Sequence, residues 1–194
     1  MPRDSGEERQ VLRGSTTYLT RFDKANIETA RGWLNDPAVN EWLLSSQLPY
    51  SSEQEAAFFD LTEREWSQGT AYRFEIHVAE DDRFIGITGL DDVSLVHRRG
   101  EVGIFVGSLP HQNRGYGRDA IVTLLRFGFD NLGLHSIAIR ANTENERAVH
   151  LYRSIGFTET GRERECAFMR GRFHDHVCFD MLASEFHERY GLSG

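Results

Sequence analysis

A glycine-rich segment placed directly before an amphipathic helix is the feature of this sequence that most restricts its fold. The segment is Gln112-Asn113-Arg114-Gly115-Tyr116-Gly117. The apolar residues after it recur with the period of an α-helix: Ile121, Leu124, Leu125, Gly128, Phe129 and Leu132. This spacing predicts a helix from about Gly117 to Gly133 with one apolar face, preceded by a loop and a strand.

The same segment is suited to binding an anion. Glycine lets a ligand approach the backbone closely, and the first turn of a helix offers unpaired N–H groups to a negative charge. Arg114 and Arg118 could add charge-assisted contacts to a phosphate. The alternative is a glycine turn that only starts a helix. A P-loop is excluded because Lys24 is the sole lysine of the chain, and no G-x-G-x-x-G opens a βαβ unit.

The rest of the chain has the patterns of an α/β domain. Strands are predicted over 17–22, 74–78, 84–90, 101–106, 136–141, 157–169 and 173–182. Helices are predicted over 25–34, 38–44, 52–66 and 144–155. Residues 1–15 are charged and lack periodicity, so we expect a flexible leader there and a single domain over residues 16–190.

Charge is distributed unevenly along the 194 residues, whose formal net charge is −8. Residues 1–110 hold 19 acidic and 11 basic groups, whereas residues 111–194 hold 11 of each. This acidic balance argues against a general nucleic-acid binder. No apolar run approaches the ~20 residues of a membrane helix, and the polar N-terminus has no signal-peptide core. We therefore expect a cytoplasmic protein with no nucleic-acid and no membrane partner.

Cysteine and histidine give weak signals. Cys166 and Cys178 are too few for a disulfide scaffold, and we expect two reduced thiols, with a bridge between adjacent strands as the alternative. His174, His176 and Cys178 alternate along one predicted strand. Residues two apart on a strand lie about 7 Å from one another, which strains coordination of one ion by all three. Structural roles, or positions at the rim of a substrate site, are favoured, and no metal is expected.

Two motifs together resemble the GNAT superfamily of acyl-CoA-dependent N-acyltransferases. Residues 112–117 fit that family's Q/R-x-x-G-x-G/A pyrophosphate loop, and residues 142–157 fit its N-x-x-N-x-x-A-x-x-L-Y-x-x-x-G-F block. The resemblance spans roughly Thr17 to Leu182. Trp33-Leu34-Asn35-Asp36-Pro37 with Trp42, and Gly171-Arg172-Phe173-His174-Asp175, resemble the branch of ribosomal-protein N-terminal and spermidine acetyltransferases. The resemblance implies a mixed, mainly antiparallel sheet of six or seven strands with helices on both faces and a V-shaped opening for acyl-CoA.

The resemblance also implies how the donor, acetyl-CoA, is held. Residues 112–118 would bind the diphosphate, and the strands around Phe105 and Ile139 would splay apart. Backbone groups of Ile104, Phe105 and Val106 would then pair with the pantetheine, and one N–H could stabilise the oxyanion. Asn142 and Asn145 would either contact the cofactor or cap the helix that follows them.

Direct attack by an amine requires an acid and a base. Tyr152 is the predicted general acid, because a hydroxyl with a pKa of ~10 can protonate the leaving thiolate; an ordinary core tyrosine is the alternative. Glu101 is the first candidate for the base, against a solvated charge at a strand end. Glu41, His97 and Asp91 follow in that order.

The leading hypothesis is an amine N-acetyltransferase. Its acceptor would be a cationic small amine or polyamine, drawn to the acidic part of the chain, or a protein N-terminus. The alternative is a non-catalytic acyl-CoA-binding regulatory module with the same fold. A homodimer is an open possibility.

Overall fold

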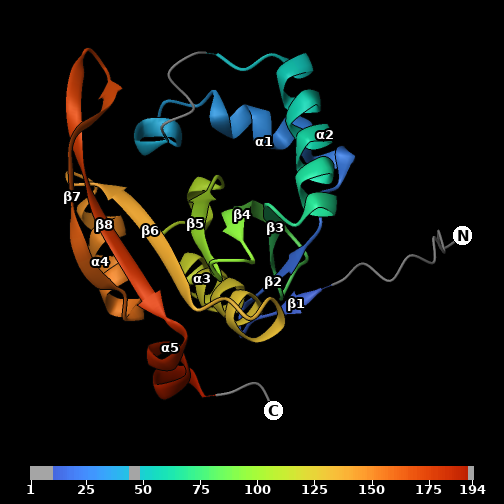
Figure 1. The fold of residues 1–194 in the computed structure, drawn as a ribbon. Coiled ribbons are helices and arrows are strands. Elements are labelled where there is room, and N and C mark those ends of the chain that lie inside the picture. The colour runs from blue at the N-terminus through green and yellow to red at the C-terminus, as the bar shows by residue number, and fades with distance from the viewer. Residues whose placement is uncertain (1–10, 44–48, 192–194) are drawn as a thin grey trace, which may run out of the picture.

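The protein forms one large twisted sheet with helices on both faces (Figure 1). The computed structural model describes residues 11–43 and 49–191. Over these ranges the strands, in chain order, are β1 (Leu12–Arg13), β2 (Thr17–Thr20), β3 (Tyr72–Val78), β4 (Phe84–Ser94), β5 (Arg99–Val106), β6 (Ser136–Asn142), β7 (Thr158–Met169) and β8 (Arg172–Leu182). The order across the sheet is β1-β2-β3-β4-β5-β6-β8-β7, and each neighbouring pair is antiparallel except β5 with β6. The α/β fold with a mainly antiparallel sheet is thus confirmed.

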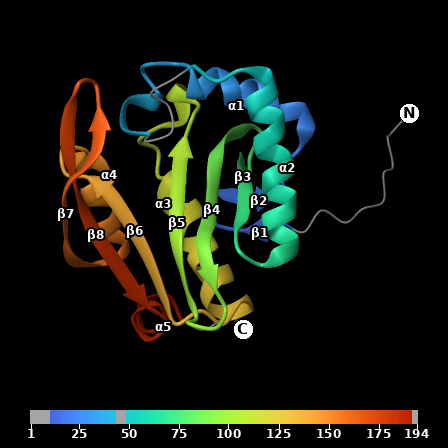
Figure 2. The ribbon, with the colours of Figure 1, turned by 45° about the horizontal axis from the view of Figure 1, so that its top comes forward.

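The helices of the described residues are α1 (Ile27–Leu34), α2 (Ser52–Gln68), α3 (Tyr116–Arg126), α4 (Glu146–Ile155) and α5 (Ala183–Tyr190). Helix α2 lies against β3, and α3 crosses the opposite face behind β4 and β5 (Figures 1 and 2). The predicted apolar stripe explains this, because Ile121, Leu124 and Leu125 of α3 are fully buried in the core. They join Phe74 and Leu90 of the sheet in one cluster.

The sheet has eight strands, where six or seven were predicted. The additional strand is β1, which pairs Leu12 with Leu19 and lies inside the segment predicted as a leader. The backbone N–H groups of Ser15, Thr16 and Thr17 donate to the Asp119 carboxylate of α3 over 2.8–2.9 Å. This tertiary anchor orders residues that have no periodicity of their own. Residues 1–10 of the predicted leader lie outside the described residues.

Two helix predictions need correction, and one helix was not predicted. The predicted helix at 38–44 is only a 3₁₀ turn, Asn40–Trp42, in the described residues 38–43. Asp36 Oδ1 accepts from the N–H of Ala38 as a helix cap would, but Leu43, with φ of −86° and ψ of 120°, is extended and ends the turn. The helix at 117–133 starts at Tyr116 and changes after Arg126 to a π-helical turn, Phe127–Asn131. Helix α5 was not predicted, because it is short and largely polar and so has no clear apolar period. Its buried residue is Phe186.

Strands β5 and β6 separate at one end. Their parallel pairing runs from Arg99 with Ser136 to Val102 with Ile139 and ends there. Beyond this point β5 continues to Val106 and β6 to Asn142, and the two diverge (Figure 2). The implied V-shaped opening is therefore confirmed, with β5 presenting a stretch that lacks a β6 neighbour.

Candidate active site

A cleft of about 670 Å³ occupies the opening between β5 and β6. Its lining, in chain order, consists of Ala38, Val39, Glu41, Trp42, Leu43, Asp91, Glu101–Val106, His111, Gln112, Asn113, Gly115, Gly117, Arg118, Arg140, Ala141, Asn142, Asn145, Arg147, Ala148, Leu151, Tyr152 and His176. The cleft thus connects the start of α3 with the carboxylates of β4, β5 and the segment after α1. Most of the predicted site residues meet in it.

One end of the cleft is formed by the start of α3. Gly115 is the N-cap residue with φ of 86°, and no side chain caps the helix. A Cβ added at Gly115 would meet no atom within 4 Å. The first-turn N–H groups of α3 therefore remain available as hydrogen-bond donors beside open space. This is the arrangement that binds phosphate.

Arginine and glutamine side chains complete this end. Gln112 Nε2 donates to the carbonyl of Val106 over 2.9 Å and so ties the loop to β5. Arg147 Nη2 donates to Gln112 Oε1 over 3.4 Å, and Arg118 also lines the cleft. Arg147 was missed, although it lies between Asn145 and Ala148 of the second motif. Arg114 and Tyr116 are not among the lining residues: Arg114 is exposed, and Tyr116 packs on His111.

The two asparagines of the second motif lie on the β6–α4 wall. Asn145 caps α4, with Oδ1 accepting from the N–H of Ala148 over 3.2 Å. Asn142 is 4% exposed, and its Oδ1 accepts from the N–H of Glu144. Its Nδ2 has no hydrogen-bond partner among the described residues. A buried donor without a partner at a cleft wall indicates a position that a ligand's acceptor would complete.

Tyr152, on α4, also lines the cleft. It is 6% exposed and packs edge-on against Phe179 with ring centroids 6.1 Å apart. Burial raises the pKa of Tyr152 to about 12, because the phenolate would be formed in an apolar environment. The hydroxyl therefore stays protonated through the neutral range, as a proton donor must.

Two carboxylates face each other at the other end of the cleft. Asp91 of β4 and Glu101 of β5 are direct cross-strand partners. Glu101 Oε1 accepts from Arg140 Nε over 2.7 Å, and Arg140 Nη1 also donates to Glu163 over 3.2 Å. Asp91 pairs with Arg73 over 2.5 Å. Burial raises the pKa of Asp91 above its ordinary value even though the Arg73 charge opposes this effect.

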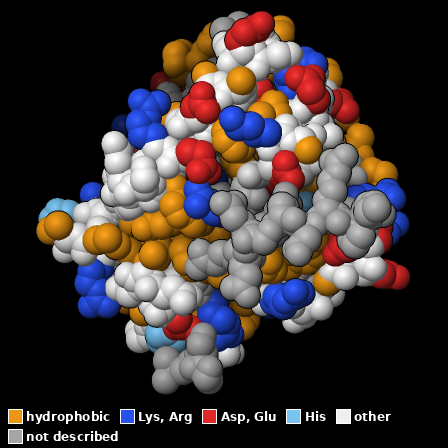
Figure 3. Space-filling view, turned by 90° about the vertical axis from the view of Figure 1, so that its right-hand side faces the viewer, with side chains coloured by type: hydrophobic (Ala, Val, Ile, Leu, Met, Phe, Trp, Pro, Cys, Tyr) orange, Lys and Arg blue, Asp and Glu red, His pale blue; other side chains and the backbone are white. Residues whose placement is uncertain are grey.

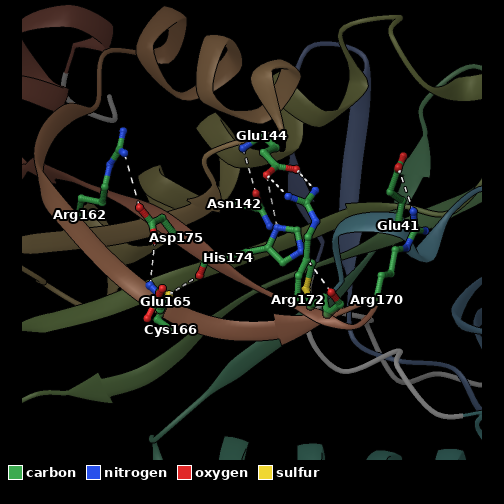
Figure 4. Close-up of polar contacts among 11 residues, drawn as sticks. Glu41, Asn142, Glu144, Arg162, Glu165, Cys166, Arg170, Arg172, His174 and Asp175 are labelled. Carbon is green, nitrogen blue, oxygen red and sulfur yellow. Dashed lines mark hydrogen bonds and ion pairs between the residues drawn. The ribbon is translucent and has the colours of Figure 1, made fainter.

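The other base candidates divide between the cleft and the surface. Glu41 lines the cleft, where Arg170 at the tip of the β7–β8 hairpin pairs with it over 3.2 Å (Figure 4). His97 is exposed in the turn between β4 and β5, at the end of β5 remote from Val106, and does not line the cleft. Its candidacy as the base was wrong, because strand direction separates it from the opening.

His174, His176 and Cys178, which alternate along β8, do not lie together in one site. His174 is buried beside the carbonyl of Met169 at 3.2 Å, and burial raises the pKa of the Cys178 thiol. Only His176 of the three lines the cleft. Both cysteines are free thiols, as expected.

The acidic excess of the chain is not displayed as one continuous surface on the face shown in Figure 3. Acidic and basic side chains are interspersed over the upper part of that face, with hydrophobic side chains between them. Inside the cleft, the carboxylates of Glu41, Asp91 and Glu101 are part of the lining. No helix of the described residues is long and apolar enough to cross a membrane.

Comparison with known proteins agrees with this geometry. Residues 17–158 match the acetyltransferase (GNAT) domain family. Spermidine N(1)-acetyltransferase of Vibrio cholerae serotype O1 is 32% identical over 141 residues, 73% of this chain and 79% of its own. YdaF of Bacillus subtilis (strain 168), provisionally named a ribosomal N-acetyltransferase, is 25% identical over 154 residues, 78% of this chain and 82% of its own.

A solved structure is similar over nearly its whole length. It is spermidine N-acetyltransferase from Vibrio cholerae in complex with CoA and spermine, with a TM-score of 0.79 and 26% identity, covering 89% of this chain and 98% of that one. The resemblance to the spermidine and ribosomal-protein branch is thereby confirmed. Since the family match extends over well more than half of the chain, the protein belongs to the GNAT family and is an N-acetyltransferase.

Proposed function

We propose that the protein transfers the acetyl group of acetyl-CoA to a primary amino group of a polyamine. The observation that carries the proposal is one cleft whose lining includes an uncapped helix start, two paired carboxylates and Tyr152. GNAT acetyltransferases take the acetyl group from acetyl-CoA, so the family defines the donor. The charges in the cleft support a cationic acceptor.

The donor fits the end formed by α3. The N–H groups at the start of α3, with Arg118 and Arg147 nearby, would hold the diphosphate. The stretch of β5 from Ile104 to Val106, which has no β6 neighbour, offers backbone groups to the amides of the pantetheine arm. The unpartnered Nδ2 of Asn142 would donate to an acceptor atom of the cofactor.

The acceptor fits the opposite end. Asp91 and Glu101 place carboxylates there, Glu41 adds a third carboxylate to the lining of the same cleft, and a polyamine carries several ammonium groups at neutral pH. The two related enzymes of Vibrio cholerae and Bacillus subtilis differ in their named acceptors, a polyamine and ribosomal protein respectively. Several carboxylates in one cleft favour a multiply charged amine over an N-terminus with one positive charge.

A proton path follows from the two ends. An ammonium group must lose one proton before it can attack the thioester. We assign Asp91 as the base that takes this proton through a water molecule and then releases it to solvent. Both carboxylates are paired with an arginine, Glu101 with Arg140 and Asp91 with Arg73. Asp91 is assigned the proton because burial raises its pKa, and Glu101, the first candidate from the sequence, is assigned to binding the ammonium charge. The C–N bond forms, and the C–S bond then breaks. Tyr152 protonates the leaving thiolate and regains a proton from the nitrogen as the amide forms.

A steady-state assay of thiol release from acetyl-CoA tests the proposal. The acceptor panel comprises spermidine, spermine, simple monoamines and a peptide with a free N-terminus. Thiol release with the polyamines, at higher kcat/KM than with the monoamines or the peptide, is the expected result. Absence of thiol release with every acceptor, despite acetyl-CoA binding, would instead indicate the non-catalytic module. Faster reaction with the peptide would refute the polyamine assignment.

A further inference from the structure

A bulge in β7 brings together three side chains that the sequence separates. Glu163 pairs with His176 across β7 and β8, and the next pair is Ala167 with His174. The residues between, 164–166, therefore stand opposite Asp175 alone. Glu165 has φ of 49°, and its N–H donates to Asp175 Oδ1 over 2.8 Å, which fixes the bulge (Figure 4).

The bulge changes where Cys166 lies. In a regular strand, residues three apart point to opposite faces, so Glu163 and Cys166 would be separated by the sheet. Here one ligand atom from each of Glu163, Cys166 and His176 lies within 4.8 Å of the other two. Bulges commonly re-aim a side chain in this way beside functional sites.

We propose that Glu163, Cys166 and His176 form a binding site for a divalent transition metal of the Zn²⁺ class. Thiolate and imidazole are soft ligands that favour zinc over calcium or magnesium, and one carboxylate oxygen is a common third zinc ligand. With three protein ligands, water would complete the tetrahedron. The thiol of Cys166 loses its proton to solvent when the metal binds.

The geometry needs a small contraction. Bonds of about 2.0–2.3 Å place the ligand atoms of a tetrahedral Zn²⁺ about 3.5 Å apart, so the three atoms must approach by about 1 Å. Glu163 and Cys166 are exposed and can change rotamer, while the buried His176 supplies a fixed point. The Cys166 thiol gives up a long hydrogen bond of 3.7 Å to the carbonyl of His174 (Figure 4).

Arg140 contacts a ligand residue of this site, Glu163. It donates to Glu163 Oε2 over 3.2 Å, which leaves Oε1 to bind the metal and orients the carboxylate, as hydrogen bonds to metal-binding carboxylates do. Its other carboxylate partner is Glu101 in the cleft, and His176 lines the same cleft. A bound dication would therefore add positive charge to the cleft wall.

Titration of the reduced protein with Co²⁺ under nitrogen tests the site. Zn²⁺ has a filled d shell and is silent, whereas Co²⁺ bound to a thiolate shows a charge-transfer band in the near ultraviolet. One equivalent of Co²⁺ should give this band, and added Zn²⁺ should remove it. Cys166→Ser should abolish the band and weaken Zn²⁺ binding by about tenfold or more, because a ligand is lost.

Cys178→Ser is the matched control, since Cys178 lies on the adjacent strand and outside the cluster. It should keep the band and the Zn²⁺ affinity. Absence of the band in the wild type, its persistence in Cys166→Ser or its loss in Cys178→Ser would each overturn the proposal. The readout needs no substrate, so the result is independent of the proposed acetyl transfer.

Discussion

Arg170, at the tip of the β7–β8 hairpin, pairs with Glu41 over 3.2 Å across 129 positions of sequence. Glu41 lines the cleft, so under the proposed function a polyamine would compete with the Arg170 guanidinium for this carboxylate. Farther along the hairpin, Arg172 forms two hydrogen bonds with Glu144, at 2.8 Å and 2.5 Å (Figure 4). The hairpin is thus attached at its tip by a contact that a cationic acceptor can replace.

Arg170→Gln should lower KM for spermidine. The ion pair is about half exposed, and such pairs contribute about 0.2–1 kcal/mol, which corresponds to at most about a fivefold change in KM. Steady-state kinetics at low and high salt measure the effect, which should shrink at high salt through screening. Arg164→Gln, in the exposed bulge of the same hairpin, is the control and should leave KM unchanged. An equal drop in both variants would indicate general loss of positive charge.

Tyr152→Phe should lower kcat by about 10²–10⁴-fold, because general acid catalysis contributes about that much. The KM and binding constant for acetyl-CoA should change little, since the ring remains packed against Phe157 and Phe179. Steady-state kinetics with calorimetric binding of acetyl-CoA separate the two effects. Tyr72→Phe, in the core against Trp66, serves as the control for loss of a hydroxyl. An undiminished kcat in Tyr152→Phe would remove the residue from this role.

Asp91→Asn should remove the acid limb of the pH profile. A base must be ionised, and burial raises the pKa of Asp91, so wild-type kcat should fall as pH drops through a value above the usual ~4 of an aspartate. Profiles of kcat against pH for wild type and variant measure this. Glu101→Gln is the comparison: it should raise KM for the polyamine and retain the acid limb. If Glu101→Gln alone loses the limb, the proton assignment must be reversed.

Gly115→Ala should weaken acetyl-CoA binding more than it destabilises the fold. Both Gly115 and Gly171 have positive φ, at 86° and 79°, and a Cβ at either position meets no atom within 4 Å. Alanine at either position should therefore cost about 1–2 kcal/mol of backbone strain. Only at Gly115 does the methyl group enter the space in front of the α3 N–H groups. Thermal unfolding and acetyl-CoA titration should show equal strain but weaker binding in Gly115→Ala alone.

Asp119→Asn should lower the free energy of unfolding by about 2 kcal/mol, because hydrogen bonds to charged groups are worth about 1.5–3 kcal/mol. Burial alone would raise the pKa of Asp119, but hydrogen bonds from Thr16, Ser15 and Thr17 lower it below its ordinary value. The stabilisation is therefore complete above the unfolded pKa near ~4 and is lost as pH falls through the lower folded pKa. Urea unfolding at pH 7 and at acid pH measures it.

The exposed Asp60→Asn on α2 is the control for this measurement and should leave stability within about 0.5 kcal/mol. If both variants unfold at the same urea concentration, the anchor between α3 and the β1–β2 turn contributes nothing measurable. A loss in Asp119→Asn that persists unchanged at acid pH would also contradict the ionic origin.

The sequence by itself determined the elements whose pattern is local. The glycine segment and the apolar stripe predicted the start and buried face of α3, and the second motif placed Asn142, Asn145 and Tyr152 on one wall of the site. These residues depend on helix period and capping, which act over a few positions. The same locality explains why α1, α2 and α4 were found within a few residues of their ends.

Only the tertiary structure decided which distant groups meet. Sheet register sets Asp91 opposite Glu101, and the order β6-β8-β7 brings Arg140 between Glu101 and Glu163. The strand β1 forms because Asp119, more than a hundred residues later, satisfies its turn. One bulge places Cys166 beside His176, which strict alternation along the strand would forbid. Register and bulges depend on partner strands, and so the charges of the site cannot be paired from the order of residues alone.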